Sequence, residues 1–358
     1  MNLKKILNND LIISLIVVVV VVCMAIIFAS FNNQVIPLFP NAHFHYLPRT
    51  SNSLSFLSNW DGPNYLNIVN HGYNSVKMAN FFPLYPLVVY VVKQVLGSAL
   101  NSALIVSWLS LVGAVYFYLK VIEKIFNNTK IENKFKAISF FILFPSGVFL
   151  IATYTEPLFS LFLFSAIYFA LNKKYLMSGL LTMLATATHI TGLFLIILVF
   201  FILLEQKVNL LKALIAAVIG GLGIASYMVF LQTKYHNFLE FLKTQHQIHG
   251  WLYYSFSNLL HSMDFFNVVF VVLLIITIYY WWSRRKSFAI YSFLFLLIPT
   301  LGGQFGGFNR YVLIAFPLQF MAYDFFKEHS KYYPYIMALM GICWTLFLLE
   351  YAGGYIGG

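Results

Sequence analysis

The segment from Asn59 to Tyr73, NWDGPNYLNIVNHGY, sets reactive side chains into an otherwise apolar chain. Asp61 could act as a general base, since a carboxylate at the edge of an apolar cleft can take a proton from a hydroxyl group. Asp-Gly-Pro is also typical of a turn held by an Asx hydrogen bond, and that interpretation is equally good for Asp61 alone. The polar and aromatic neighbours favour catalysis, and we expect four of them to bind substrate: Trp60, Tyr65, His71 and Tyr73.

Three more ionisable residues stand at the edges of apolar runs. Glu156 precedes a proline, as acids do at helix N-termini, so a structural role is its simpler interpretation. His189 lies between two short apolar runs; a lone histidine there is often structural, but ionisable residues at membrane depth are usually functional. Arg310 follows the glycine-rich GGQFGGFN and could snorkel at a helix end. Its guanidinium also suits a phosphate, which it can bind through two parallel hydrogen bonds, and we favour that role.

Neither a metal centre nor a resident cofactor is predicted. His246 and His249 are spaced as i and i+3, but no third ligand and no HExxH pattern accompanies them. We interpret their loop as an amphipathic helix that covers the site. Cys23 and Cys343 both lie inside apolar runs, which excludes a disulfide framework and a cysteine-based metal site. A requirement for a divalent cation stays open.

The composition indicates which elements must position these residues. Hydrophobic residues make up 61% of the 358 residues and charged residues 9%, with a mean hydropathy of +0.80. Soluble chains carry about 25% charged residues. We therefore predict one integral membrane domain over residues 1–358, an all-α polytopic bundle of about eleven transmembrane helices.

The first apolar run is too long for a cleavable signal and is interpreted as a span. Residues 176–204 could form one long tilted helix in place of two short ones. The predicted spans are 11–31, 99–119, 137–153, 157–171, 176–188, 189–204, 208–232, 266–282, 287–301, 311–326 and 333–350.

The apolar segment 81–97 is predicted not to span the membrane. Pro83 and Pro86 interrupt its start, and the remaining helix of about eleven residues rises only about 16 Å, against a hydrocarbon core of about 30 Å. The positive-inside rule supports this choice, because a spanning segment 81–97 would reverse the orientation of every later loop. With the segment at the interface, sixteen of the 22 cations face the cytoplasm: Lys4, Lys5, Lys120, Lys124, Lys130, Lys134, Lys136, Lys173, Lys174, Lys207, Lys212, Arg284, Arg285, Lys286, Lys327 and Lys331.

This topology places the polar segments on one side of the membrane. The net charge of +11 then reflects orientation, and nucleic acid binding is not expected. We predict a plasma-membrane protein with a cytoplasmic N-terminus and a site that faces outside. The segments on the outer side are a first extracytoplasmic loop with an interfacial helix (32–98), a second large loop (233–265), YTEP (154–157), THITG (188–192) and GGFNRY (306–311).

Four segments resemble the PIG-V-type GPI-anchor second mannosyltransferases and their bacterial relatives, a branch of the GT-C glycosyltransferases. WDGPNYLNIVNHGY with the following FFPLYPL resembles the first-loop signature of the family. FNRYVLIAFPLQF (308–320) looks like its C-terminal Arg-Tyr…Phe-Pro motif, and FPSGVFLIATYTEPLFSLF (144–162) is similar to its Pro-Ser…Tyr-Ser-Glu stretch. ATATHITGL (185–193) stands where the family has an Ala-rich run ending in Arg-x-x-Gly, so a histidine replaces the arginine.

The resemblance implies a GT-C-like bundle and a transferase that uses a polyprenyl-phosphate sugar as donor on the outer face of the membrane. It implies that Asp61, the acid of the first outside loop, is the catalytic base. Arg310 and His189 would bind the donor phosphate, and Glu156 and Tyr311 would contact substrate. The acceptor, whether glycan, lipid or protein, is not implied, because a bacterial-looking chain need not make GPI.

Both lines of argument lead to an inverting transfer, and the resemblance implies that the sugar is a hexose such as mannose. A phosphate leaves as a stable anion without a general acid, so one base and one or two cations are enough. Asp61 would take the proton of the acceptor hydroxyl, while Arg310 with His189 would stabilise the leaving phosphate. To serve one sugar phosphate, Asp61 and Arg310 should lie within about 15 Å of each other.

Three alternatives to this function are weighed. A flippase or permease for a lipid-linked sugar would share the arginine, but transporters place polar residues near the midplane in repeated halves, and no internal repeat is evident. A membrane-anchored assembly protein without catalysis is disfavoured by the acids at conspicuous turns. Transfer from another lipid-phosphate donor, such as a phosphoethanolamine lipid, would normally require a metal site.

Overall fold

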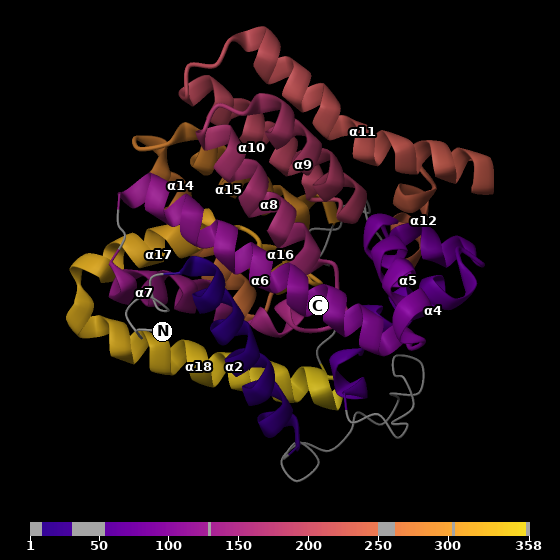
Figure 1. Ribbon diagram of the computed structural model, residues 1–358, viewed down its shortest axis with the longest axis horizontal. Helices are drawn as coiled ribbons and strands as arrows, with labels where there is room; N and C mark the ends of the chain where they lie inside the picture. Colours follow the sequence, from indigo (N-terminus) through magenta and orange to yellow (C-terminus); the bar gives the residue numbers. More distant parts are fainter. Residues whose placement is uncertain (1–8, 31–53, 128–129, 250–261, 303–304, 356–358) are drawn as a thin grey trace. The chain divides into compact units, whose positions relative to one another are not determined.

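The computed structural model describes residues 9–30, 54–127, 130–249, 262–302 and 305–355 (Figure 1). In these ranges the chain forms helices joined by turns, which confirms the all-α prediction. The chain divides into two compact units. Unit 1 comprises residues 1–70, 85–164 and 322–357, and unit 2 comprises residues 71–84, 165–321 and 358.

Unit 1 is built on the long helix α6 (Ala99–Phe126). Helix α2 (Asp10–Ser30) lies against α6 and against α18 (Tyr333–Gly353), and α7 (Ile131–Ile142) also packs on α6 (Figure 1). The unit also contains η2 (Ser55–Leu57), most of α4 (Asp61–His71) and α5 (Leu84–Leu96), η4 (Gly147–Leu150), the first part of α8 (Glu156–Leu171), the end of α17 (Pro317–Glu328) and η5 (Ser330–Tyr332).

Buried ion pairs anchor the start of α2 in unit 1. The Asp10 carboxylate lies 2.5 Å from Lys120 Nζ and 2.6 Å from Lys134 Nζ. Glu123 binds the same two lysines at 3.1 and 2.7 Å. Burial alone would lower the pKa of Lys134, but hydrogen bonds to the two carboxylates raise that pKa above its usual value. The four charges therefore join α2, α6 and the segment of α7 in one network.

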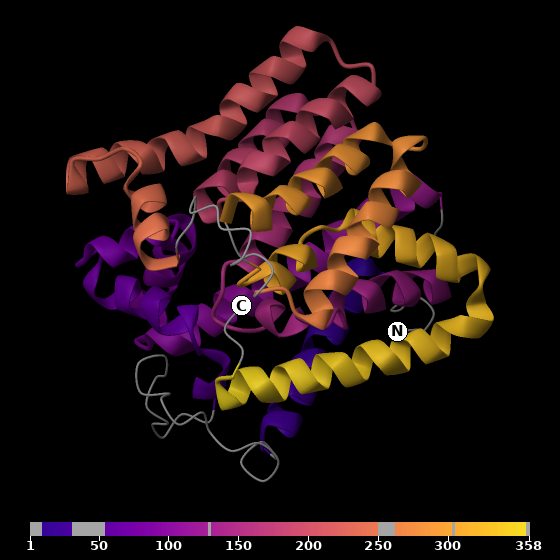
Figure 2. The same ribbon diagram turned by 180° about the vertical axis from the view of Figure 1, so that it is seen from behind.

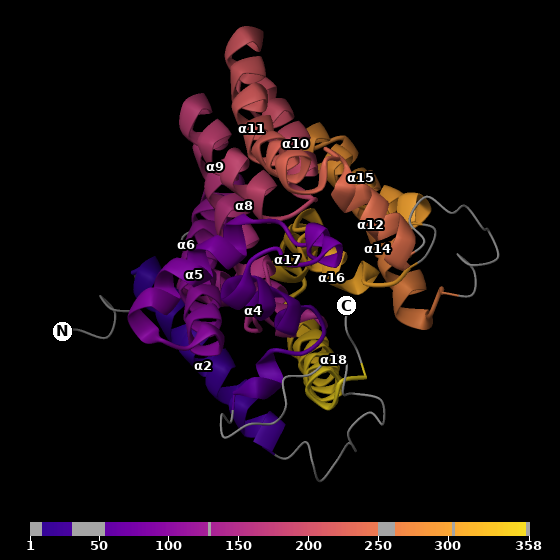
Figure 3. The same ribbon diagram turned by 90° about the vertical axis from the view of Figure 1, so that its right-hand side faces the viewer.

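Unit 2 contains three helices in mutual contact (Figure 2): α9 (Tyr175–Thr188), α10 (Gly192–Glu205) and α11 (Leu210–Tyr235). Helices α14 (Phe265–Trp282) and α15 (Lys286–Gly302) run side by side (Figure 3), and α15 also packs on α10. The unit also contains η3 (Val76–Asn80), α12 (Glu240–His249), α16 (Phe308–Leu313) and the start of α17.

Small residues allow α9 and α11 to approach closely. A Cβ atom added to Gly220 would lie 2.8 Å from Thr182 Cγ2, and one added to Gly223 would collide with the Met183 carbonyl and the Thr186 hydroxyl. The Thr186 hydroxyl donates to the Gly220 carbonyl at 2.7 Å. Such small-residue contacts are typical of closely packed membrane helices. This α9–α11 seam holds the end of α9, which His189 follows.

Five described helical stretches are long and apolar enough to cross a membrane: α2, α6, α11, α14 and Ser330–Gly353. Shorter apolar helices are α5, α8, α9, α10 and Lys286–Pro299. The chain is therefore a multi-pass membrane protein. The number of eleven spans stays a prediction.

The predicted span 137–153 is wrong as a continuous helix. Helix α7 ends at Ile142, and Pro145 follows, which disfavours helical backbone at the residue before it. A Cβ atom on Gly147 would lie 2.5 Å from the Ile142 carbonyl oxygen, so only glycine fits this reversal. Trp108 Nε1 donates to the Ile151 carbonyl at 2.9 Å. Irregular backbone at membrane depth is tolerated where protein buries it in this way.

The predicted span 311–326 is also divided into two helices. Helix α16 ends at Leu313 and α17 begins at Pro317, because proline lacks an amide hydrogen and clashes with the preceding turn. Two buried side chains satisfy carbonyl groups at the break. Gln319 Nε2 donates to the Leu313 carbonyl at 2.7 Å, and Trp281 Nε1 donates to the Pro317 carbonyl at 2.9 Å.

The division of residues 176–204 into two helices is confirmed. Helix α9 ends at Thr188, and His189 has extended backbone with φ −154° and ψ 146°.

In the first loop, α4, η3 and α5 are helical, and α5 rises about 20 Å over its 13 residues, too little for a span. The interfacial position of α5 stays a prediction. Residues 32–53 of the first loop and 250–261 of the second lie outside the described residues.

Candidate active site

Asp61 is the first residue of α4, where an acidic side chain stabilises the first turn of a helix. The residue before it, Trp60, has a left-handed backbone with φ 57°. This conformation costs a non-glycine residue about 1–2 kcal/mol. Strained residues of this kind persist only where the surrounding structure holds them.

Two buried tyrosine hydroxyls hold Asn59, the residue before this strained turn. Tyr351 of α18 accepts a hydrogen bond from the Asn59 backbone N–H at 3.0 Å. Tyr154, which precedes α8, donates to the Asn59 carbonyl at 3.1 Å and accepts from the Asp61 backbone N–H at 3.2 Å. Asn59 Nδ2 donates to the Tyr351 carbonyl at 2.8 Å. We call Asn59, Tyr154 and Tyr351 the Asn59 clamp; all three are 2% exposed or less.

A second set of contacts joins the same two segments. The Thr153 hydroxyl donates to Ser58 Oγ at 2.8 Å, and the Thr153 backbone N–H donates to the Leu57 carbonyl at 2.9 Å. A Cβ atom on Gly62 would lie 2.5 Å from Thr153 Oγ1 and 2.7 Å from Ser58 Oγ. Gly62 is therefore required because two chain segments approach each other there.

Glu156 is the first residue of α8 and is 1% exposed. Its position at a helix N-terminus fits the structural interpretation, but a helix start does not require burial of a carboxylate, and acids are almost never fully buried unless paired. Thr155 Oγ1 lies 3.4 Å from Glu156 Oε2. Tyr65 of α4 packs edge-on against Tyr154, with ring centroids 6.4 Å apart. Unit 1 therefore brings Trp60, Asp61 and Tyr65 together with the segment that carries Glu156.

His189 lies in unit 2, in the turn between α9 and α10, and is 6% exposed. The Thr191 backbone N–H points at His189 Nδ1 over 3.3 Å, and the Thr191 hydroxyl lies 2.7 Å from the same atom. A backbone N–H can only donate, so Nδ1 accepts and the neutral ring is assigned its proton on Nε2. A neutral histidine in this tautomer can donate one hydrogen bond to an anion.

Arg310 lies in the last turn of the six-residue helix α16, which follows Gly307 at φ 73°. Arg310 therefore belongs to a short helix and does not stand before one continuous span over 311–326. Its guanidinium carbon lies 5.6 Å from the centroid of the Tyr311 ring, and the Tyr311 ring lies 5.7 Å from the His189 ring. The two residues predicted to bind the donor phosphate thus lie in unit 2 beside Tyr311, which was predicted to contact substrate.

Tyr73 and His71 have different surroundings in unit 2. The Tyr73 hydroxyl donates to the Phe81 carbonyl at 2.7 Å, and its ring packs on Tyr227 and Phe230 of α11. These contacts give Tyr73 a structural role. His71 lies at the end of α4 and is exposed. Binding of substrate by either residue stays a prediction.

The predicted site residues fall into two groups. Trp60, Asp61, Tyr65 and Glu156 belong to unit 1, and His71, Tyr73, His189, Arg310 and Tyr311 belong to unit 2. The expectation that both groups serve one substrate stays a prediction. Sequence analysis did not identify the clamp: Asn59 and Tyr154 stand in the quoted motifs and could have been found there, whereas nothing in the sequence marks Tyr351.

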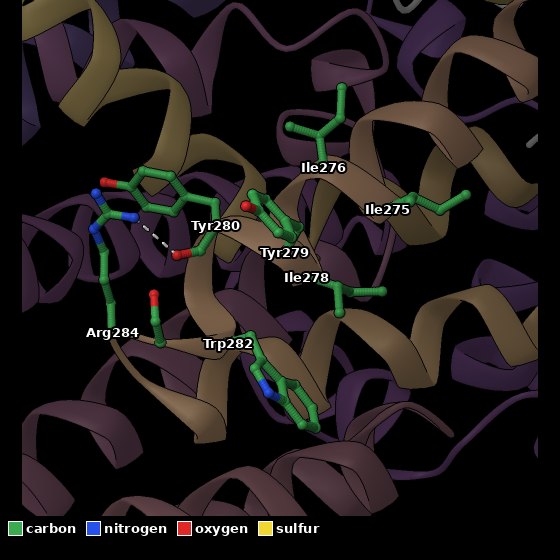
Figure 4. A pocket seen from close by; sticks show the side chains of 8 residues that line it. Ile275, Ile276, Ile278, Tyr279, Tyr280, Trp282 and Arg284 are labelled. Atoms are coloured by element: carbon green, nitrogen blue, oxygen red, sulfur yellow. Dashed lines mark hydrogen bonds between the residues drawn. The ribbon is translucent and has the colours of Figure 1, made fainter.

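A hollow of about 640 Å³ lies elsewhere, at the end of α14 in unit 2 (Figure 4). The Arg284 guanidinium stacks 4.0 Å from the Tyr280 ring centroid and donates to the Tyr280 carbonyl at 3.1 Å. Aromatic and basic residues at the end of a span are typical of a membrane–water interface. None of the predicted site residues is in its lining, which consists of Ile275, Ile276, Ile278, Tyr279, Tyr280, Trp282, Ser283 and Arg284.

Across the described part of the chain, no three His, Cys, Asp or Glu residues gather as metal ligands would.

Comparison with known proteins gives a family match over most of the chain. A family model described as mannosyltransferase (PIG-V) matches residues 11–295. Human GPI alpha-1,6-mannosyltransferase 2 is 33% identical over 149 residues, which cover 39% of this chain and 30% of the human protein. GPI mannosyltransferase 2 of Yarrowia lipolytica is 32% identical over 135 residues, 37% of each chain. The matched stretches thus span about a third of the length of these curated relatives.

Proposed function

Because the chain belongs to the mannosyltransferase (PIG-V) family, we propose that it is a glycosyltransferase that moves a hexose such as mannose onto an acceptor hydroxyl. The donor is a polyprenyl-phosphate sugar, whose prenyl chain is solvated by the membrane around the apolar helices. The fold is of the GT-C type, and the reaction takes place on the outer face of the plasma membrane.

Asp61 is the general base of the proposed reaction. Its carboxylate takes the proton of the acceptor hydroxyl while that oxygen attacks the anomeric carbon from the side opposite the phosphate. The C–O bond to the phosphate breaks with its electron pair on the phosphate oxygen, so the anomeric centre is inverted. The observation that carries this assignment is the left-handed turn at Trp60, which the Asn59 clamp holds directly before Asp61.

Arg310 and His189 stabilise the leaving phosphate. A guanidinium binds phosphate oxygens in a fixed fork, and a neutral His189 with its proton on Nε2 adds one further donor. The Tyr311 ring lies next to both side chains, with its centroid 5.7 Å from the His189 ring and 5.6 Å from the Arg310 guanidinium carbon. Glu156, Trp60 and Tyr65 remain candidates for sugar contacts.

Sugar transfer in isolated membranes tests the proposal. Membranes that contain the protein and membranes from the same host without it receive a panel of radiolabelled polyprenyl-phosphate sugars, and labelled acceptor is separated from donor. We expect transfer from one donor in the first membranes only. Donor that crosses the bilayer without being consumed would replace the transferase by a flippase, and a donor that is neither consumed nor moved would contradict both.

A further inference from the structure

We propose that Tyr351 is a positioning residue for Asp61, acting through the Asn59 clamp. This inference rests on the proposed role of Asp61 as general base. Tyr351 lies beyond residues 11–295, the range matched by the family model, and 292 positions from Asn59 in sequence. Its part in the site is therefore visible only in the fold.

The two tyrosine hydroxyls of the clamp bind backbone groups on both sides of Trp60. The Tyr154 hydroxyl donates its one proton to the Asn59 carbonyl and accepts from the Asp61 N–H. The Tyr351 hydroxyl accepts from the Asn59 N–H and lies 3.3 Å from the Asn59 carbonyl. The N–H and the carbonyl of Asn59 are thus held before the left-handed residue Trp60, and the N–H of Asp61 is held after it.

The position of Tyr351 makes this grip rigid. Its ring lies 6.1 Å from the Tyr154 ring and 5.7 Å from the Phe149 ring, both edge-on, and it is completely buried. It stands in the last turn of α18, where its carbonyl accepts from the Gly354 backbone N–H at 3.0 Å. The Asn59 side chain supplies a second donor, since its Nδ2 donates to the Tyr351 carbonyl at 2.8 Å. The end of α18 and the turn before Asp61 therefore hold each other.

Loss of the Tyr351 hydroxyl should change where the carboxylate sits without unfolding the protein. In Tyr351→Phe the ring and the backbone carbonyl stay, but the buried Asn59 N–H loses its acceptor. The left-handed turn at Trp60 then has one restraint fewer, and small displacements of a reacting group reduce rates by up to about a hundredfold. Because Tyr351 does not touch the sugar, KM should not change.

The matched control is Tyr333→Phe. Tyr333 is on the same helix, and its hydroxyl shares a hydrogen bond of 2.8 Å with Ser139 Oγ in the same unit. Each variant loses one tyrosine hydroxyl of α18 with its hydrogen bonds, but only the Tyr351 hydroxyl reaches the segment before Asp61. A Tyr154→Phe variant, which removes the partner of the Asp61 N–H directly, serves if Tyr351→Phe does not fold.

The experiment combines transfer kinetics with hydrogen–deuterium exchange on the full-length protein. We expect kcat of Tyr351→Phe to fall roughly 10- to 100-fold with KM within about twofold of wild type, while Tyr333→Phe keeps wild-type kcat. Asp61→Glu already displaces the carboxylate, so adding Tyr351→Phe to that variant should lower kcat little further. The Asn59 and Asp61 amides should exchange faster in Tyr351→Phe than in wild type, and their exchange rates should be unchanged in Tyr333→Phe.

Exchange separates this inference from the proposed function. If wild type transfers no sugar, the proposed function fails, and exchange at the Asp61 amide still decides whether Tyr351 holds this segment. Unchanged exchange in Tyr351→Phe, a kcat equal to wild type, or a full additional loss on the Asp61→Glu background would each overturn the inference.

Discussion

At Asp61, a left-handed residue and the first turn of a helix together set the direction in which the carboxylate leaves the backbone. Residue types alone indicated Asp61, because an acid is rare in this chain and stands among aromatic and amide side chains. The partners that hold it could not be predicted in the same way. Tyr351 is one of 24 tyrosines, and only the packing of α18 brings its hydroxyl to Asn59.

Arg310 gives a prediction at the residue scale. In Arg310→Gln the bidentate donor for the phosphate is lost, so we expect KM for the donor to rise about tenfold or more, with a further fall in kcat. The measurement is transfer rate against donor concentration. Arg284→Gln is the control, because Arg284 is also an arginine of unit 2 but stacks on Tyr280 at the end of α14. Equal donor KM in Arg310→Gln and wild type would exclude Arg310 from the phosphate site.

Proline decides where the helices differ from their prediction. By hydropathy, 137–153 and 311–326 are unbroken apolar runs, because a hydropathy average does not register that helices α7 and α16 end before Pro145 and Pro317. Attention to these two residues would have located both breaks. No local sequence signal identifies the distant donors, Trp108 and Trp281, that bind carbonyl groups at the two breaks.

The α9–α11 seam gives a prediction at the scale of elements. In Gly223→Ala the new methyl group collides with the Met183 carbonyl and the Thr186 hydroxyl, so we expect α9 to shift and stability to fall by about 1–3 kcal/mol. Thermal unfolding in detergent measures this. Gly221→Ala is the control, since nothing lies within 4 Å of its added Cβ. Equal melting temperatures in the two variants would show that the seam does not depend on close approach.

The network at the start of α2 gives a second prediction at this scale. Asp10→Asn leaves Lys120 and Lys134 paired only with the partly exposed Glu123, and breaking a buried ion pair costs up to about 3–5 kcal/mol. Thermal unfolding should show a clear loss, whereas Glu132→Gln should melt like wild type, because Glu132 binds Lys136 from an exposed position.

The pH dependence of this loss follows from Lys134. Its pKa is raised in the folded state, so its stabilisation is complete below the ordinary value of 10.5 and is lost only as pH rises through the raised pKa. The difference in melting temperature between wild type and Asp10→Asn should therefore persist from neutral pH to mildly alkaline pH. A difference that disappears below pH 10.5 would mean that Lys134 is not charged in the network.

At the scale of the whole molecule, composition was sufficient to predict an all-α membrane protein, because charged residues are too few for a soluble fold of this length. The number of spans was not determined in the same way. Helices α9 and α10 have 14 residues each, fewer than a straight span needs, and hydropathy cannot tell a short span from a helix that enters and returns.

The orientation of the chain can be tested by labelling. With Cys23 and Cys343 replaced by serine, single cysteines are placed at the exposed positions Lys77 and Lys286. The positive-inside rule predicts that a membrane-impermeant maleimide labels Lys77→Cys in intact cells and Lys286→Cys only after permeabilisation. The reverse pattern would place Asp61 on the cytoplasmic side and contradict an outer-face reaction.

The most direct test of the account compares sugar transfer by wild type and Asp61→Asn in membranes, with the exposed acid variant Glu328→Gln as control. Both variants must insert in normal amounts. We predict that Asp61→Asn loses transfer by roughly 10²- to 10⁴-fold, since the amide cannot accept the proton of the acceptor hydroxyl, while Glu328→Gln transfers as wild type does. Transfer at the wild-type rate by Asp61→Asn would contradict the assignment of the base and shift it to Glu156.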